Sequence, residues 1–259
     1  MNVILETKDL TIGFGKNKTI KIVVENINLR LQAGQLIALI GSNGAGKSTL
    51  LRTLARVQNP LGGLVFVENR DVNEFSNLEI AQKISLVLTE KLPESNLTVY
   101  DIIALGRQPY TNWVGKLSAV DLVAIEAAIA CTEIEHLRDK KHFEISDGQL
   151  QIVLIARALA QETPIIILDE PTTHLDLPHK ISLFRLLKKL AVESGKCIVF
   201  STHDIELAIE MADLLVAISK GNVVQANADL MIENGVLDSV FDEQQIVFDR
   251  IKRKFIFRN

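Results

Sequence analysis

A glycine-rich segment with one lysine and three hydroxyl side chains could bind phosphate groups. Residues 41–49 fit the pattern G-x-x-x-x-G-K-[ST], between an apolar run at 36–40 and a helical pattern after it. The glycines let successive backbone N–H groups point at phosphate oxygens, and the helix N-terminus adds a partial positive charge. We therefore predict a nucleoside triphosphate site. Its residues are Gly41, Ser42, Asn43, Gly44, Ala45, Gly46, Lys47, Ser48 and Thr49. Lys47 would reach the β- and γ-phosphates during catalysis, and Ser48 would bind Mg²⁺.

Two carboxylates follow a second apolar run. Residues 165–168 are Ile-Ile-Ile-Leu, and Asp169 and Glu170 come directly after them. In open α/β sheets the carboxyl ends of buried strands face the crevice that holds the ligand. A surface turn could have the same sequence, so it is the phosphate loop upstream that favours a functional interpretation of this pair. We expect Asp169 to hold Mg²⁺, and Glu170 to act as the general base or to position the attacking water.

The composition is that of an ordinary globular protein, with 259 residues, of which 47% are hydrophobic and 23% charged. A formal net charge of −4 argues against a dedicated nucleic-acid-binding protein, so we expect no nucleic-acid partner. Cys131 and Cys197 lack metal-ligand spacing, and we expect two reduced, apolar thiols. The chain has no run of about 18 apolar residues that could span a bilayer. Its first residues lack the pattern of an export signal, so we expect no export.

Apolar runs and helix-start signals alternate along the chain, which predicts an α/β protein with a mainly parallel sheet. Strand-like runs occur at 3–5, 20–31, 36–40, 61–67, 84–88, 165–168, 197–200 and 214–218. Helical patterns occur at 150–161, 178–193 and 204–211, and helix-start signals occur at Ser76-x-x-Glu79, Thr98-x-x-Asp101 and Ser118-x-x-Asp121. We predict a single domain over 1–259. Residues 1–89 and 146–259 would form its nucleotide-binding core, and residues 90–145 an inserted helical subdomain.

Several motifs, in their order along the chain, resemble those of the ATP-binding cassette (ABC) family. Residues 145–149, Ile-Ser-Asp-Gly-Gln, resemble the signature L-S-G-G-Q and precede the carboxylate pair. His203 follows a strand, where the family places a switch histidine that meets the γ-phosphate. Residues 171–176 resemble the family's D-loop, with Asp176 at its aspartate. Phe14 lies where the family has an aromatic side chain that stacks on adenine.

The resemblance covers nearly the whole chain, and it implies a fold, cofactors and partners. The fold would be a P-loop NTPase cassette, with an N-terminal antiparallel β region beside the mainly parallel core and the helical subdomain. Such proteins hydrolyse ATP with Mg²⁺ as head-to-tail homodimers that hold two ATP molecules between the protomers. The resemblance therefore makes Ser146, Gly148 and Gln149 nucleotide contacts in trans. It also makes His203 catalytic and Asp176 a nucleotide contact.

Two positions depart from the family's pattern. Asp147 replaces the first glycine of the signature pair, which puts a carboxylate near a bound triphosphate. This carboxylate could oppose closure of the dimer by charge repulsion, or it could cap the helix that follows; we favour the cap. At the family's Q-loop, Thr89 stands where related proteins have glutamine, and Glu90 follows it. Either side chain could contact Mg²⁺ or its water, and we assign Thr89, the aligned residue, to the metal site.

A further segment is more selective within the family. Residues 103–113 resemble the A-L-G-R-x-P-Y segment of ATPases that energise uptake of iron–siderophores, haem and cobalamin, and the C-terminal β-rich stretch to Phe257 fits the same group. This resemblance implies an integral membrane permease as direct partner and an extracytoplasmic substrate-binding protein as indirect partner. It also implies a peripheral location on the cytoplasmic face of the inner membrane. Tyr110 and Trp113 would contact a partner or form a buried aromatic pair.

Three alternatives remain open beside the metal-chelate importer. The first is an ABC importer ATPase for another solute, with the same chemistry and a different permease. The second is a soluble ABC ATPase without a permease, of which the single-cassette iron–sulfur assembly type fits this length best. The third is a nucleotide-binding regulator that does not hydrolyse ATP, which the intact Glu170 disfavours.

Overall fold

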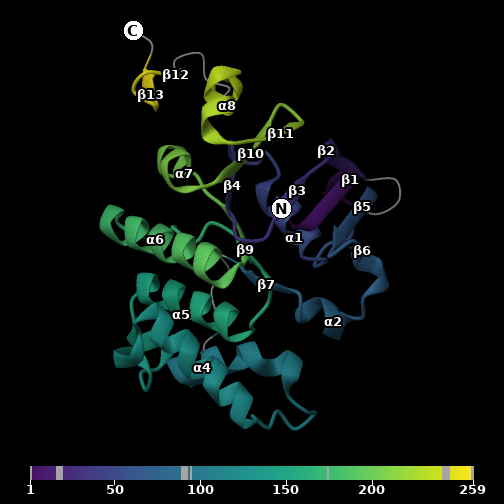
Figure 1. Ribbon diagram of the computed structural model, residues 1–259. Coiled ribbons are helices and arrows are strands. Elements are labelled where there is room, and N and C mark those ends of the chain that lie inside the picture. The colour runs from purple at the N-terminus through teal and green to yellow at the C-terminus, as the bar shows by residue number, and fades with distance from the viewer. Residues whose placement is uncertain are drawn as a thin grey trace.

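The computed structural model describes residues 2–15, 20–88, 93, 95–173, 175–240 and 246–257. An antiparallel sheet lies near the N-terminus, in the order β2-β1-β5-β6, with β3 also paired to β1. Its strands are β1 (Val3–Phe14), β2 (Lys21–Ile27), β3 (Arg30–Gln32), β5 (Gly62–Val67) and β6 (Arg70–Asp71). Figure 1 shows this sheet on the right of the molecule.

The central sheet has six strands in the order β11-β10-β4-β9-β8-β7. All its neighbouring strands are parallel except β10 and β11. The strands are β4 (Leu36–Gly41), β7 (Ile84–Val87), β8 (Ile165–Leu168), β9 (Cys197–Ser201), β10 (Leu214–Ser219) and β11 (Asn222–Ala226). These two sheets confirm the predicted mainly parallel α/β core with an N-terminal antiparallel region.

The described helices are α1 (Lys47–Leu54), α2 (Asn77–Ala81), α3 (Val99–Ala104), α4 (Ala119–Thr132), α5 (Asp147–Ala160), α6 (Leu177–Ser194), α7 (Ile205–Met211) and α8 (Ala228–Glu233). The three predicted helix starts are confirmed as complete capping boxes before α2, α3 and α4. A hairpin of β12 (Ile246–Asp249) and β13 (Lys254–Phe257) ends the described chain and confirms the predicted C-terminal β-rich stretch.

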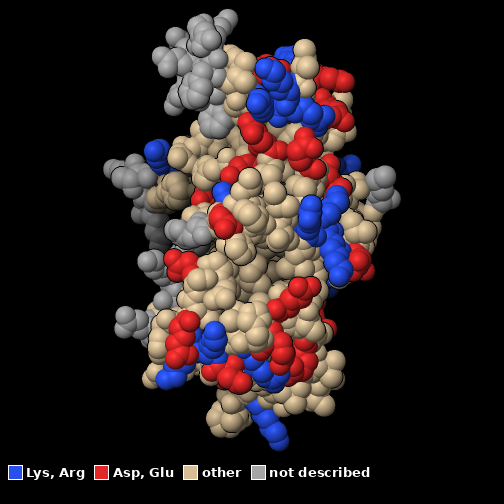
Figure 2. Space-filling model, turned by 90° about the vertical axis from the view of Figure 1, so that its left-hand side faces the viewer, with Lys and Arg blue, Asp and Glu red and all other residues tan. Residues whose placement is uncertain are grey.

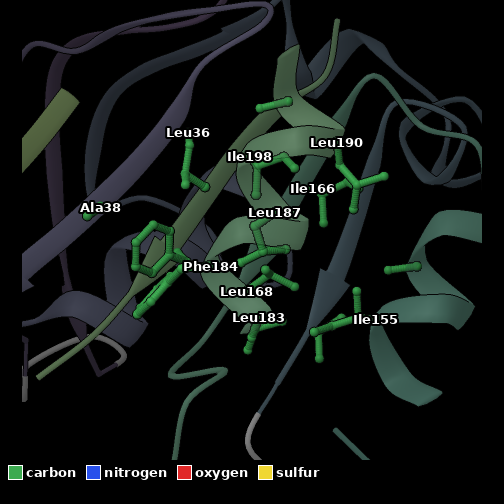
Figure 3. Packing of buried hydrophobic residues seen from close by; sticks show 14 of the residues in the cluster. Leu36, Ala38, Ile155, Ile166, Leu168, Leu183, Phe184, Leu187, Leu190 and Ile198 are labelled. Atoms are coloured by element: carbon green, nitrogen blue, oxygen red, sulfur yellow. The ribbon is translucent and has the colours of Figure 1, made fainter. Parts of the chain in front are cut away.

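Strand β4 is buried on both faces, as its continuous apolar sequence predicts. Ile37 and Leu39 pack toward α1 and the N-terminal sheet. Leu36 and Ala38 face the opposite way, into the cluster with Phe184 of α6 that Figure 3 shows from close by. Because β4, β8 and β9 are parallel, their carboxyl ends meet at one edge of the sheet. The phosphate loop, the carboxylate pair and the residues after β9 therefore lie side by side.

The segment after α3, a 3₁₀ helix over Leu105–Tyr110, packs tightly against α5. A Cβ atom added to Gly106 would lie 2.2 Å from the carbonyl oxygen of Arg157 in α5, so only glycine fits there. The buried Arg107 donates from Nη1 to the carbonyl oxygen of Ala160 at 2.7 Å. The glycine and arginine of the A-L-G-R segment thus join the segment to α5.

Asp121 in α4 has its pKa lowered to about 2 by hydrogen bonds from Ser118 and from Arg107. The ionised Asp121 carboxylate thus stabilises the fold at pH values above its ordinary pKa of 3.8, and this stabilisation is lost as the pH falls toward 2. We expect Asp121→Asn to lower the free energy of unfolding clearly at about pH 5 and roughly half as much at about pH 3, in urea titrations. Asp101→Asn is the control, because Asp101 completes the same capping box on α3 at an exposed site. An equal loss at both pH values would contradict this expectation.

The two aromatic side chains after α3 do not form a buried pair. Trp113 is 97% exposed, and Tyr110 lies 4.1 Å from the Arg107 guanidinium and donates its hydroxyl to the Gln161 carbonyl at 2.9 Å. The buried-pair interpretation is therefore wrong, because Tyr110 is held at the surface of α5 and Trp113 lies beyond it.

Within the described ranges, no helix combines the length and apolar character that crossing a bilayer requires. Figure 2 shows acidic and basic side chains interspersed toward the top and bottom of one face, around a mostly uncharged area at its centre that basic side chains border on the right.

Candidate nucleotide site

The phosphate loop leaves β4 at Gly41 and enters α1 at Lys47. Gly46 precedes the helix with a φ of 106°, and a Cβ atom there would lie 2.6 Å from Cγ1 of Val23. Gly44 also has a positive φ, of 76°. Both conformations favour glycine. The first N–H groups of α1 have no partner within the helix and are therefore available to a phosphate bound in the loop.

Lys47 is nearly buried, with 5% of its surface exposed. Its Nζ donates to the carbonyl oxygens of Gly41 at 2.9 Å and Ser42 at 3.2 Å. Burial lowers the pKa of this ammonium group, and the nearby Glu170 and Asp169 oppose that change. The lysine is thus held between the loop and the carboxylate pair, within reach of both.

Asp169 lies at the carboxyl end of β8, where it is 3% exposed. The hydroxyl of Ser48 donates to its Oδ1 at 3.0 Å, and the hydroxyl of Ser201 donates to the same oxygen at 2.7 Å. Hydroxyl and carboxylate oxygens are donors that suit Mg²⁺. No group of three or more His, Cys, Asp or Glu side chains among the described residues could hold a metal. A metal ion at Ser48 and Asp169 would therefore also take ligands from phosphate and water. Thr89, the other expected metal contact, lies outside the described residues.

Glu170 has a φ of 48°, a backbone conformation that is uncommon for a residue with a side chain. Its Oε1 lies 2.5 Å from Nε2 of His203, which follows β9. Thr173 donates to its other carboxylate oxygen at 3.4 Å. A small cavity of about 140 Å³ borders both Glu170 and His203. The structure thus brings together the predicted general base and the predicted switch histidine beside a space that can hold water.

Ser201 is a site residue that the sequence analysis missed. Its buried hydroxyl accepts from the backbone N–H of Glu170 at 2.8 Å and donates to Asp169, so one side chain holds both carboxylate residues. A serine at the end of a strand carries no signal of its own. Only the pairing of Leu168 with Phe200 in the β8–β9 register could have pointed to it.

We expect Ser201→Ala to lower the free energy of unfolding by about 1 kcal/mol, because it leaves the partly buried N–H of Glu170 without its partner. Turnover of ATP should fall as well, since the same change releases Asp169. Ser85→Ala is the matched control, because Ser85 is a buried strand serine of the same sheet that contacts Thr163 instead. Thermal unfolding and steady-state hydrolysis measure the two effects, and equal turnover in both variants would contradict the role of Ser201.

The residues predicted to act in trans lie away from the phosphate loop. Ser146 caps α5, where its hydroxyl accepts from the N–H of Gln149 at 3.2 Å and its N–H donates to Gln149 Oε1 at 3.0 Å. Gly148 lies in the first turn, and a Cβ atom there would be 2.8 Å from Cδ2 of Leu175. No hydrogen bond recorded for the described residues joins this turn to the phosphate loop.

The preferred interpretation of Asp147 as the helix cap is wrong. Ser146 is the N-cap of α5, and Asp147 is the exposed first residue of the helix. A capping side chain must come from the residue before the first helical turn, and Ser146, with Gln149 three residues later, takes that position. The helix therefore begins at 147 rather than near 150. The Asp147 carboxylate lies at the positive end of the helix dipole.

Two more predicted contacts lie at the rim of the site. Asp176 caps α6 by accepting from the backbone N–H of His179 at 3.1 Å, and it also contacts the His179 ring. These two hydrogen bonds lower the pKa of the Asp176 carboxyl. Phe14 ends β1 with 51% of its surface exposed, so its ring is accessible to a ligand. A cavity of about 450 Å³ lies between the C-terminal end of α4, the start of α5 and the side of α6, and no phosphate-loop residue borders it.

Comparison with known proteins places this arrangement in a family. A family model described as "ABC transporter" matches residues 24–173. An ABC transporter ATP-binding protein of Methanocaldococcus jannaschii is 38% identical over 98% of this chain and 87% of its own length. The ferric enterobactin transport ATP-binding protein of Escherichia coli is 37% identical over 86% of this chain and 81% of its own length.

Solved structures give the same result. One chain of an inward-facing ABC transporter, described as of the metal-chelate type, superposes with a TM-score of 0.79 at 28% identity, over 98% of this chain and 96% of that one. A dimeric ATP-binding cassette in a post-hydrolysis state, bound to ADP and phosphate, superposes with a TM-score of 0.75 at 28% identity, over 87% of this chain and 99% of that one.

Proposed function

Since the chain belongs to the ABC transporter family, we propose that it is the ATP-hydrolysing subunit of an importer that takes up a metal chelate through a separate permease. The chelate would be an iron–siderophore, haem or cobalamin. The observation that carries the enzymatic part is the contact of Glu170 with His203, beside Lys47 and Asp169. The metal-chelate part is supported by similar proteins that are named for iron(3+)-hydroxamate import and ferric enterobactin transport.

The geometry supports a division of work within one protomer. The N–H groups of the phosphate loop and Lys47 would bind the β- and γ-phosphates of ATP, and Ser48 and Asp169 would hold Mg²⁺. Bound Mg²⁺ would neutralise charge that develops on the phosphate oxygens. Glu170 would accept a proton from the attacking water, and His203 would hold the Glu170 carboxylate in place and donate toward the γ-phosphate.

The remaining predicted contacts fit a symmetric dimer. Ser146, Gly148 and Gln149 lie at the exposed start of α5, so they are free to meet ATP bound to a second copy of the chain. Asp176 and Phe14 are exposed too and would add contacts at the edge of the nucleotide. Solved dimers of similar cassettes support this assembly.

The permease would contact the helical part of the chain, which we assign to residues 90–145, between core residues 1–89 and 146–259. Trp113 and Val114 are exposed in this part, and large apolar side chains gathered on a surface indicate a contact with another protein. The chain would then lie peripherally on the cytoplasmic face of the membrane, and the substrate-binding protein would reach it only through the permease.

Asp147 would stand near the γ-phosphate bound to the partner protomer, because it follows the Ser146 cap. Like charges about 4 Å apart repel by about 1 kcal/mol in water, so we expect Asp147→Asn to lower the ATP concentration needed for dimerisation about fivefold. Asp147→Gly should act in the same direction with a lower thermal stability, since glycine weakens the first turn. Light scattering during ATP titration measures the dimer. An unchanged titration for Asp147→Asn would contradict the repulsion.

Uptake by cells tests the proposed function. A strain without this chain should lose accumulation of iron supplied as a siderophore complex, or of haem or cobalamin. The wild-type chain should restore that uptake and Glu170→Gln should not. Unimpaired uptake of all three chelates in the deletion strain would overturn the metal-chelate assignment. ATP hydrolysis by the purified protein would remain a separate test of the enzymatic part.

A further inference from the structure

The side chain of Asp204 makes an unusual connection next to the switch histidine. Asp204 precedes α7, but its carboxylate does not cap that helix. It accepts instead from Nζ of Lys180, at 2.9 Å to each oxygen, and from the hydroxyl of Thr172 at 3.0 Å. The backbone N–H of Asp204 donates to the hydroxyl of the fully buried Thr202 at 3.0 Å. Asp204 thus ties the short segment that carries His203 to α6 and to the segment that follows Glu170.

Lys180 lies in the first turns of α6, directly after the segment that begins with Glu170. Its contact with Asp204 therefore joins α6 to the loop after β9, across the cavity that Glu170 and His203 also border. About three-quarters of the Lys180 side chain is covered, with 23% exposed, so this ion pair is less screened than a surface pair. Lys180 can thus hold the His203 segment in place without contacting ATP.

We propose that Lys180 is a positioning residue that holds His203 against Glu170 through Asp204. This inference rests on the proposed ATPase function. With the ion pair broken, Asp204 would keep its contacts with Thr172 and Thr202 and lose its ion pair to α6. The imidazole would then leave the 2.5 Å contact with Glu170 for part of the time. Misplacement of a catalytic group by about 1 Å can lower a rate about 100-fold, whereas nucleotide binding depends on the phosphate loop and should be unchanged.

The same helix provides a matched control. Lys188 of α6 forms an ion pair with Asp213, and the two side chains are covered to a similar degree as those of Lys180 and Asp204. Asp213 also accepts from the N–H of Leu36 at 2.9 Å, at the start of β4 and away from the carboxylate pair. Loss of the Lys188 pair should therefore affect stability as loss of the Lys180 pair does, without affecting His203.

Steady-state hydrolysis with Lys180→Met, Lys180→Arg and Lys188→Met tests the proposal. We expect Lys180→Met to lower kcat about 10- to 100-fold with KM for ATP within about twofold, and Lys180→Arg to restore most of kcat. Lys188→Met should keep the wild-type kcat, although its Tm should be similar to that of Lys180→Met. An unchanged kcat in Lys180→Met, or an equal fall in Lys188→Met, would overturn the positioning role. Absence of hydrolysis in the wild-type protein would instead contradict the proposed function.

A second readout does not depend on hydrolysis. In ¹⁵N-histidine-labelled protein, the imidazole signal of His203 can be assigned by its absence in His203→Gln. We expect its chemical shift to change in Lys180→Met and to match the wild type in Lys188→Met. An unaltered His203 signal in Lys180→Met would overturn the connection through Asp204, whatever the ATPase assay gives.

Discussion

Replacement of Glu170 by glutamine is expected to lower ATP turnover by about 10²–10⁴-fold while ATP binding persists. Glutamine has nearly the same shape as glutamate and can keep the contacts with His203 and Thr173, but its amide cannot accept a proton from water. Lys47 and the phosphate loop are unchanged by this substitution, so ATP should accumulate in a closed dimer. Size-exclusion chromatography with ATP and Mg²⁺ would detect that dimer, and release of phosphate would measure turnover.

Glu162→Gln is the matched control for this variant. Glu162 also has a positive φ, of 53°, and lies just before β8 as Glu170 lies just after it, but it pairs with Arg107 rather than with His203. The same chemical change at this position should leave turnover near that of the wild type. A Glu170→Gln protein that hydrolyses ATP at the wild-type rate would contradict the role assigned to Glu170.

Lys47→Ala is expected to weaken ATP binding by about 2–5 kcal/mol, which corresponds to roughly a 30- to several-thousand-fold higher Kd. Lys47 is nearly buried against the loop, so its removal leaves bound phosphate without its cation at the centre of the site. Isothermal titration of the nucleotide measures the change, and the Tm of the free protein shows whether the loop itself is intact. Lys188→Met, which removes a lysine far from the loop, should bind ATP as the wild type does. Unaltered affinity in Lys47→Ala would contradict the phosphate-loop assignment.

Features encoded over a few neighbouring residues could be predicted from the sequence. A capping box needs only two side chains three positions apart, and all three predicted boxes form. The fully apolar runs at 36–40 and 165–168 predicted strands buried on both faces, and β4 and β8 have that burial. The order of strands and helices then predicted a parallel sheet, whose carboxyl edge holds the phosphate loop and the carboxylate pair.

Features that depend on contacts between distant segments could not be predicted in this way. Ser201 reaches Asp169 because β8 and β9 are neighbours, and Lys180 reaches Asp204 because α6 packs against the loop after β9. Neither contact leaves a pattern in the chain. Asp147 was assigned wrongly because Ser and Asp are both good caps, and only the backbone shows which of them precedes the first turn. The exposure of Trp113 could not be predicted either, because its neighbours in the sequence show no helical or strand period that would indicate a buried face.

Purification of the chain from native membranes in mild detergent tests the central claim most directly. We expect a many-helix integral membrane protein to accompany it, together with a second copy of the chain, and we expect Glu170→Gln to retain that partner while it no longer turns over ATP. Recovery of soluble partners alone, under conditions that preserve a known permease complex, would contradict the importer and favour a soluble ABC ATPase of the iron–sulfur assembly type.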